Sequence, residues 1–132
     1  MASRRAQFWI GKLVVVRLPF YNAKDDKVQF KARPALVIGV EKDELPCDMN
    51  YIPLSRVSHH EYVDPVYDIK INEEQCKRLS LKYSPSYIRT HKQGTISSYD
   101  ISHRYISDLK QIDRELYDRV KKVHEMYQHT LF

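Results

Sequence analysis

The chain lacks any hydrophobic run long enough to cross a membrane, although 42% of its 132 residues are apolar. A membrane-spanning helix needs about 18 apolar residues in succession, and residues 1–11 also lack the apolar run of a secretory signal. Cysteine is scarce, and Cys47 and Cys76 have no second cysteine or histidine at the spacing of a metal site. We therefore expect a cytoplasmic protein with two free thiols, no membrane association, no metal and no cofactor.

The motifs of nucleotide-dependent and zinc-dependent enzymes are also missing. The sequence contains no GxGxxG, no P-loop, no GxSxG and no HExxH pattern. Basic residues outnumber acidic ones by 22 to 17, which gives a formal net charge of +5. This mild excess suits a polyanionic partner such as nucleic acid, or an acidic protein. A length of 132 residues is typical of one domain, spanning residues 1–132 and built around a single hydrophobic core.

The first half of the chain contains short apolar segments that predict strands. Residues 12–18 and 49–54 are rich in β-branched and other apolar side chains. A third strand, over residues 33–40, begins beside Pro34, which cannot donate to a sheet ladder and therefore belongs at a strand's entrance. This position puts Arg33 at the mouth of the strand, where its planar guanidinium could bind a phosphate. From its position alone, Arg33 is more often expected to be an ordinary surface arginine without a chemical role.

The second half of the chain alternates strands with charged segments. Residues 66–71 alternate apolar and polar side chains, and residues 86–91 are also expected to form a strand. Residues 94–101 predict either a further strand or an ordered loop. The segments over residues 21–27 and 57–65 carry charges and turn-forming residues, and we expect them to be loops. The protein is therefore expected to be mainly β.

Two helices are also expected. Asn72 followed by Gln75 has the pattern of a capping box and predicts a short helix. Near the C-terminus, apolar residues recur every three or four positions and define one helix face. That helix should begin at Asp108 or Asp113 and end near Gln128. Many short strands with one such helix indicate a small, strongly bent antiparallel sheet or barrel with the helix packed on it.

Polar residues at the ends of the predicted strands suit metal-free cleavage of RNA. In that reaction the 2′-hydroxyl attacks the adjacent phosphodiester, while the enzyme removes its proton, stabilises the phosphoryl oxygens and protonates the 5′-oxygen. An arginine and a hydroxyl serve the second task, and a histidine, or an arginine with water, serves the others. The residues concerned are Arg33, Ser55, Arg56, His59, His60, Arg89, Thr90, His91 and Lys92. Their spacing alone is not specific, and adjacent histidines such as His59 and His60 are more typical of an exposed loop.

Several segments of the chain also follow one another in a distinctive order. A hydrophobic strand over residues 12–20 leads through a charged loop into Arg-Pro-Ala-Leu-Val-Ile over residues 33–38. Residues 51–55 form a strand that ends in a serine, residues 88–90 read Ile-Arg-Thr, and residues 113–123 belong to the terminal helix. This order resembles the MazF/PemK toxins, the endoribonuclease halves of bacterial toxin–antitoxin pairs, over most of the chain.

The resemblance implies a mainly β (α+β) domain, in which an SH3-like barrel carries a C-terminal helix and forms a homodimer. It implies an endoribonuclease that cleaves single-stranded RNA without a metal and leaves a 2′,3′-cyclic phosphate and a 5′-hydroxyl. Arg33 would be catalytic and stabilise the phosphorane, and Ser55 would donate a hydrogen bond to the phosphate. An acidic antitoxin would cover the basic groove with a flexible tail. The RNA-binding residues would be Phe20, Arg56, His59, Arg89, Thr90 and Lys92, and Arg89 and Thr90 would help form either the RNA groove or the dimer interface.

The chain departs from the family at several positions. Ser55 keeps the hydroxyl of the usual threonine but lacks the methyl group that restricts its rotation. Ser84 and Ser86 replace an acidic and a basic residue that some family members use. A catalytically silent module of the same fold, which binds nucleic acid or protein, therefore stays an alternative, as does a structural subunit with only a dimer face. An ion pair on Arg33 would favour the binding module.

Overall fold

The computed structural model describes residues 5–56, 60–82 and 86–132. Its strands are β1 (Lys12–Asn22), β2 (Lys27–Val40), β3 (Asp48–Ser55), β4 (Asp68–Ile71), β5 (Ser86–Arg89), β6 (Gly94–Ser97) and β7 (Ser107–Asp108). Its α-helices are α1 (Glu73–Arg78), α2 (Leu109–Ile112) and α3 (Arg114–Gln128). Short 3-10 helices are η1 (Ala6–Trp9), η2 (His60–Tyr62) and η3 (Ser98–Asp100). No helix in these ranges is long and apolar enough to cross a membrane.

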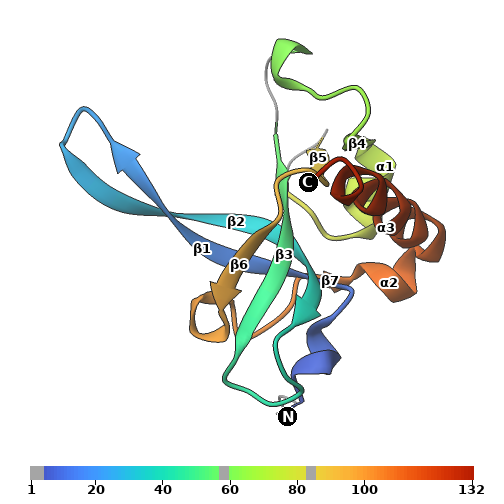
Figure 1. Cartoon of the computed structure of the whole chain (residues 1–132), viewed down its shortest axis with the longest axis horizontal. Helices are drawn as coiled ribbons and strands as arrows, with labels where there is room; N and C mark the ends of the chain where they lie inside the picture. Colours follow the sequence, from blue (N-terminus) through green and yellow to red (C-terminus); the bar gives the residue numbers. More distant parts are fainter. Residues whose placement is uncertain (1–4, 57–59, 83–85) are drawn as a thin grey trace.

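The strands form one curled antiparallel sheet, with the α-helices gathered on one side of it (Figure 1). The strand order is β4-β5-β3-β2-β1-β7, and β6 pairs with the first half of β3. The last two residues of β3 pair with β5, so β5 and β6 share one edge of β3. These features confirm the expected mainly β architecture, with a strongly bent antiparallel sheet and a C-terminal helix.

The sheet buries apolar side chains on both of its faces. Successive side chains of a strand point to opposite faces, so Leu13 and Ile52 join one cluster, whereas Val14 and Tyr51 join the other. Helices α1, α2 and α3 contribute to the first cluster, and η1 contributes Trp9 to the second. The sheet therefore separates two apolar clusters, because its central strands are apolar on both faces.

Strands β1 and β2 extend beyond the body of the protein as a two-stranded arm, which we define as residues 17–31 (Figure 1). The loop expected over residues 21–27 is much shorter than predicted. Strand pairing continues as far as Asn22 opposite Lys27, which leaves only residues 23–26 as the turn. The polar composition of this region therefore indicates solvent exposure on both faces of the arm and not the absence of regular structure.

Cation–aromatic contacts lie on both faces of the arm. The guanidinium of Arg17 is 4.4 Å from the centre of the Phe30 ring, and the Nζ of Lys31 is 4.5 Å from that of Phe20. Lys31 pairs with Leu18, the neighbour of Arg17, so the two contacts face opposite sides. An isolated two-stranded ribbon is marginally stable in water, and exposed contacts of this kind contribute about 0.5–1 kcal/mol each.

The helix ends follow the predicted capping signals. Asn72 and Gln75 form both hydrogen bonds of the capping box at the start of α1, each 2.9 Å long. Both candidate starts of the C-terminal helix are used, because Asp108 caps α2 and Asp113 caps α3. The backbone leaves the helical region at Asp113, where φ is −141°, so the apolar periodicity runs over two helices instead of one. The second of them ends at Gln128, as expected.

Several other expectations differ from the structure mainly at element boundaries. The strand expected over residues 66–71 begins at Asp68, and the strand expected over residues 86–91 ends at Arg89. Residues 94–101 hold β6 followed by η3, so this segment is partly a strand and partly an ordered turn. Both cysteines are buried free thiols, as the sequence indicates.

Candidate functional site

A pocket opens where β2 and β3 separate. The two strands pair as far as Ala35 opposite Pro53; beyond this point β2 stays with β1, while β3 pairs with β5. Pro34 and Pro53 lie at the point of separation, and neither can donate a ladder hydrogen bond because proline has no backbone N–H. Residues of both strands line the resulting pocket, whose volume is about 420 Å³.

This pocket, which we call the cationic pocket, combines positive charge with hydroxyl groups. Its lining consists of Lys31, Ala32, Arg33, Pro34, Leu54, Ser55, Arg56 and Ser86. None of the described residues around it carries a carboxylate. A concave site with cations and no acid attracts polyanions. An arginine fork and neighbouring hydroxyls can together donate several hydrogen bonds to one phosphate.

Arg33 is half-buried in this pocket, and within the part of the chain that the structure describes it forms no ion pair. Arg89 provides a contrast, because its Nε lies 3.1 Å from Oδ1 of Asp68. An ion pair on Arg33 was the feature that would favour a binding module. Among the described residues, therefore, no carboxylate competes with a ligand for its guanidinium.

Strand register brings Arg33 and Ser55 to one face of the sheet. Ala35 pairs with Pro53, and because side chains alternate along a strand, Arg33, two residues before Ala35, and Ser55, two residues after Pro53, lie on the same face as this pair. Beyond the point of separation, Ser55 pairs with Tyr87 on β5, and Arg33 pairs with Val16 on β1. This face carries the second apolar cluster, which includes Ala35. Both residues predicted to be catalytic therefore line the same pocket.

Two of the predicted RNA-binding residues lie at the cationic pocket. Arg56 lines it, and Phe20 lies beside it, because Lys31 contacts the Phe20 ring and also lines the pocket. Sequence analysis missed Lys31 and Ser86. The signal for Lys31 was present, since it precedes Arg33 by two residues and strand periodicity puts both on one face. Ser86 stands where the resemblance has a charged residue in some family members, but only the long-range pairing of β5 with β3 brings it to the pocket.

Arg89 and Thr90 have structural partners instead. Besides its ion pair with Asp68, Arg89 donates from Nη2 to the carbonyl of Tyr62 at 3.0 Å. Thr90 has no exposed surface, and its hydroxyl donates to the carbonyl of Tyr67 at 2.7 Å. A side chain without exposed surface cannot contact RNA, so the structure gives Thr90 a structural role in place of the predicted RNA contact.

The remaining predicted residues are not brought into the pocket by the described structure. Lys92 lies in the turn after β5, beside Gln93, which lines a different pocket. His59 lies outside the described residues, as do Ser84 and the side chain of His60. The part of the prediction that concerns histidine bases therefore stays a prediction.

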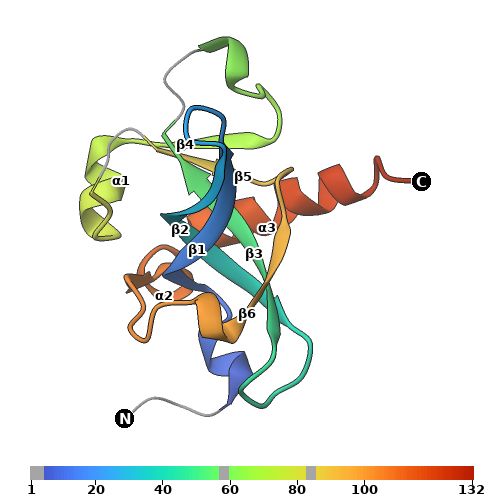
Figure 2. The same ribbon diagram turned by 90° about the vertical axis from the view of Figure 1, so that its left-hand side faces the viewer.

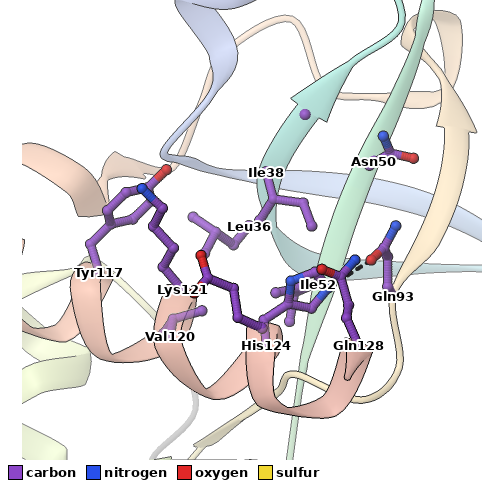
Figure 3. Close-up of a pocket in the computed structure, with 12 residues that line it drawn as sticks. Leu36, Ile38, Asn50, Ile52, Gln93, Tyr117, Val120, Lys121, His124 and Gln128 are labelled. Carbon is purple, nitrogen blue, oxygen red and sulfur yellow. Dashed lines mark hydrogen bonds between the residues drawn. The ribbon is translucent and has the colours of Figure 1, made fainter. Parts of the chain in front are cut away.

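A second pocket, of about 320 Å³, lies between α3 and the sheet (Figure 3). Its apolar floor consists of Leu36, Ile38, Ile52 and Val120. At its rim, His124 Nε2 lies 2.6 Å from Gln93 Oε1, and burial lowers the pKa of His124, which keeps the ring neutral near pH 7. Lys121 is accompanied by Glu125 on the same rim. This pocket suits an apolar group better than a phosphate, so the cationic pocket is the stronger candidate for the functional site.

Comparison with known proteins adds no family assignment: the sequence matches no family model, and no curated protein is significantly similar to it. The functional argument therefore depends on the chemistry of the cationic pocket. A phosphodiester in that pocket could accept two parallel hydrogen bonds from the fork of Arg33 and a further one from the Ser55 hydroxyl. Donors arranged in this way stabilise negative charge that develops on phosphoryl oxygens.

Proposed function

We propose that the protein is a metal-independent endoribonuclease toxin of the MazF/PemK type, an mRNA interferase that cleaves single-stranded RNA sequence-selectively. The observation that carries this proposal is the cationic pocket. Arg33 and Ser55 share it with two further cations, and none of its described lining residues is acidic. RNA is a polyanion that supplies its own nucleophile, the 2′-hydroxyl, so the protein needs only to bind the phosphate, stabilise charge and move protons.

In the proposed reaction the 2′-oxygen attacks phosphorus, and the bond from phosphorus to the 5′-oxygen breaks. A base accepts the 2′-hydroxyl proton and an acid protonates the leaving 5′-oxygen, which gives a 2′,3′-cyclic phosphate and a 5′-hydroxyl. Arg33 binds the non-bridging oxygens as their charge grows, and Ser55 donates a further hydrogen bond. Lys31 and Arg56 bind the neighbouring phosphates. The predicted base is His59 or His60, three and four residues after Arg56 in the sequence.

The same proposal extends to the fold and the partners. We propose that the curled sheet is an SH3-like barrel, that the chain forms a homodimer, and that it acts in the cytoplasm. An acidic antitoxin would cover the cationic pocket with a flexible tail, which the net charge of +5 and the pocket's lysine and arginines would favour. Expression of the chain should then be toxic to a bacterial host, and co-expression of the product of a neighbouring gene should relieve the toxicity.

The decisive experiment is cleavage of a long single-stranded RNA in the presence of EDTA. Wild-type protein should cut at a few sites and leave cyclic phosphate ends, whereas Arg33→Ala should slow cleavage by about 100- to 1,000-fold, as loss of one such donor does elsewhere. Arg17→Ala is the matched control, because Arg17 lies on the opposite face of the arm against Phe30. Ser55→Ala should also slow cleavage, while Ser55→Thr, which keeps the hydroxyl, should not.

Other outcomes separate the alternatives. RNA binding that depends on Arg33, without cleavage by the wild type, would make the protein a catalytically silent binding module. If the wild type neither binds nor cleaves RNA, the interpretation as a structural subunit remains. Equal cleavage by wild type and Arg33→Ala would point to a contaminating nuclease or a different active site, and would remove the cationic pocket from the proposal.

A further inference from the structure

Residues 60–67, which we call the rim segment, lead into β4 and are hydrogen-bonded to Arg89 and Thr90. Asp68 and Arg89 are directly opposite each other on β4 and β5. Arg89 is two residues from Tyr87, which pairs with Ser55, so Arg89 and Asp68 face the same side of the sheet as Ser55. One strand spacing and two residues of rise separate the Cα atoms of Arg89 and Ser55 by roughly 8 Å. The side chain of Arg89 spans the remaining distance, because its Nη2 reaches the carbonyl of Tyr62 in the rim segment.

Hydrogen bonds from β5 hold the rim segment in place. Arg89 bridges its ion-pair partner Asp68 and the backbone carbonyl of Tyr62, at 3.1 and 3.0 Å. The backbone amide and the hydroxyl of Thr90 both donate to the carbonyl of Tyr67, at 3.2 and 2.7 Å. The side chain of Asp68 has no exposed surface. A buried carboxylate and its arginine thus fix the backbone of a surface segment.

The rim segment also has its own internal support. The carboxylate of Asp64 accepts hydrogen bonds from the backbone amides of Val66 and Tyr67, and these bonds lower the pKa of Asp64. The backbone amide of Asp64 donates to Oδ2 of Asp68 at 2.8 Å. A segment tied at this many points loses little further conformational entropy when a ligand binds to it. It can therefore act as a preformed wall.

Tyr62 is the exposed aromatic residue on this wall. About 63% of its surface reaches solvent, although Arg89 holds its backbone. Figures 1 and 2 both show η2 and the turn of the arm in the upper part of the molecule. Exposed aromatic rings beside a cationic surface are the usual stacking platforms for single-stranded RNA.

We propose that Tyr62 stacks on an RNA base near the scissile phosphate, and that Arg89 is the positioning residue that holds Tyr62 there. The proposal rests on the proposed function and names a further contact of the same site. It also explains why Arg89, a predicted RNA ligand, has its side chain committed to Asp68 and to the rim segment. Arg89 acts on the substrate through Tyr62.

The test compares kinetics and cleavage patterns of Tyr62 variants on a single-stranded RNA that the wild type cuts. Tyr62→Ala should raise KM about tenfold or more, as loss of one stacked base does, and should alter the choice among cleavage sites with little change in kcat. Tyr62→Phe keeps the ring and should behave as the wild type. Tyr99→Ala is the matched control, because Tyr99 is 81% exposed on η3, outside the site.

A double-mutant cycle tests the role of Arg89. Arg89→Lys should raise KM in the wild-type background and add little in the Tyr62→Ala background, because both changes remove the same contact. Additive effects would reduce Arg89 to a folding role. If Arg89→Lys does not fold, the Tyr62 variants decide the stacking contact alone. A Tyr62→Ala protein that matches an active wild type overturns this inference and leaves the proposed function intact, whereas a wild type that neither binds nor cuts RNA overturns both.

Discussion

Replacing Asp68 by asparagine tests whether the buried ion pair on β4 and β5 holds this end of the sheet together. The Asp68 carboxylate is fully buried, and only 20% of the Arg89 side chain is exposed. The carboxylate accepts hydrogen bonds from Arg89 at 3.1 and 3.3 Å and from the amide of Asp64 at 2.8 Å. Asparagine keeps the shape of the Asp68 side chain but removes its negative charge. Its amide N–H₂ group would face the N–H donors of Arg89 or Asp64.

The expected loss of stability comes from the charge of Arg89, which stays largely buried after the charge of Asp68 is removed. Removal of one partner from a buried ion pair costs about 3–5 kcal/mol, because the other charge stays buried without compensation. We expect the lower end, about 3 kcal/mol, because part of Arg89 reaches solvent. For a chain of this length, 1 kcal/mol shifts Tm by about 4 °C, so Tm should fall by about 12 °C. Arg89→Met in the same protein should recover much of the loss, because it removes the orphaned charge.

Thermal and urea unfolding at pH 7.5 measure the effect, with Asp118→Asn as the matched control. The Arg114–Asp118 pair has the same 3.1 Å separation, but more than half of each side chain is exposed. Its loss should cost at most about 0.5 kcal/mol. If Asp68→Asn and Asp118→Asn shift Tm equally, burial does not determine the strength of the Asp68 pair, and the argument that it fixes the rim segment fails.

Three further changes test separate parts of the structure. Burial lowers the pKa of His91 in the folded protein below its usual value near 6.5. Between these two pKa values the unfolded chain binds more protons than the folded one, so the free energy of unfolding should fall as the pH drops below 7 through this range. Urea unfolding at pH 7.5 and 5.5 should show a smaller loss for His91→Gln than for the wild type or the exposed His103→Gln; an equal loss would contradict this assignment. Asn72→Ala removes the capping box and should cost about 1 kcal/mol in urea unfolding, with Asn72→Asp retaining most of the stability. Gly94→Ala would set a methyl group into the ring of buried Tyr51 and should lower stability by about 1–3 kcal/mol, and an unchanged Tm would show that this ring can move aside.

Local features of the structure were predictable because local sequence controls them. The capping box at Asn72 depends only on residues three positions apart, and so do the caps at Asp108 and Asp113. The apolar half of β2 could likewise be recognised from composition and periodicity. The prediction that Pro34 marks the entrance of this strand is wrong, because β2 begins at Lys27 and Pro34 lies inside it, paired with Val15. The length of the arm could not be recognised in this way, because continued pairing through Asn22 depends on contacts between strands.

The sequence by itself determined which residues could form the site, because the Arg33-Pro34 step and the serine that ends β3 are local features. Only the tertiary structure decided which of them meet. The separation of β2 from β3 after Ala35 brings Arg33 and Ser55 into one pocket. The pairing of β4 with β5 instead commits Arg89 to Asp68. Strand periodicity fixes the face on which a side chain lies, but the neighbour it meets depends on which distant strand pairs there.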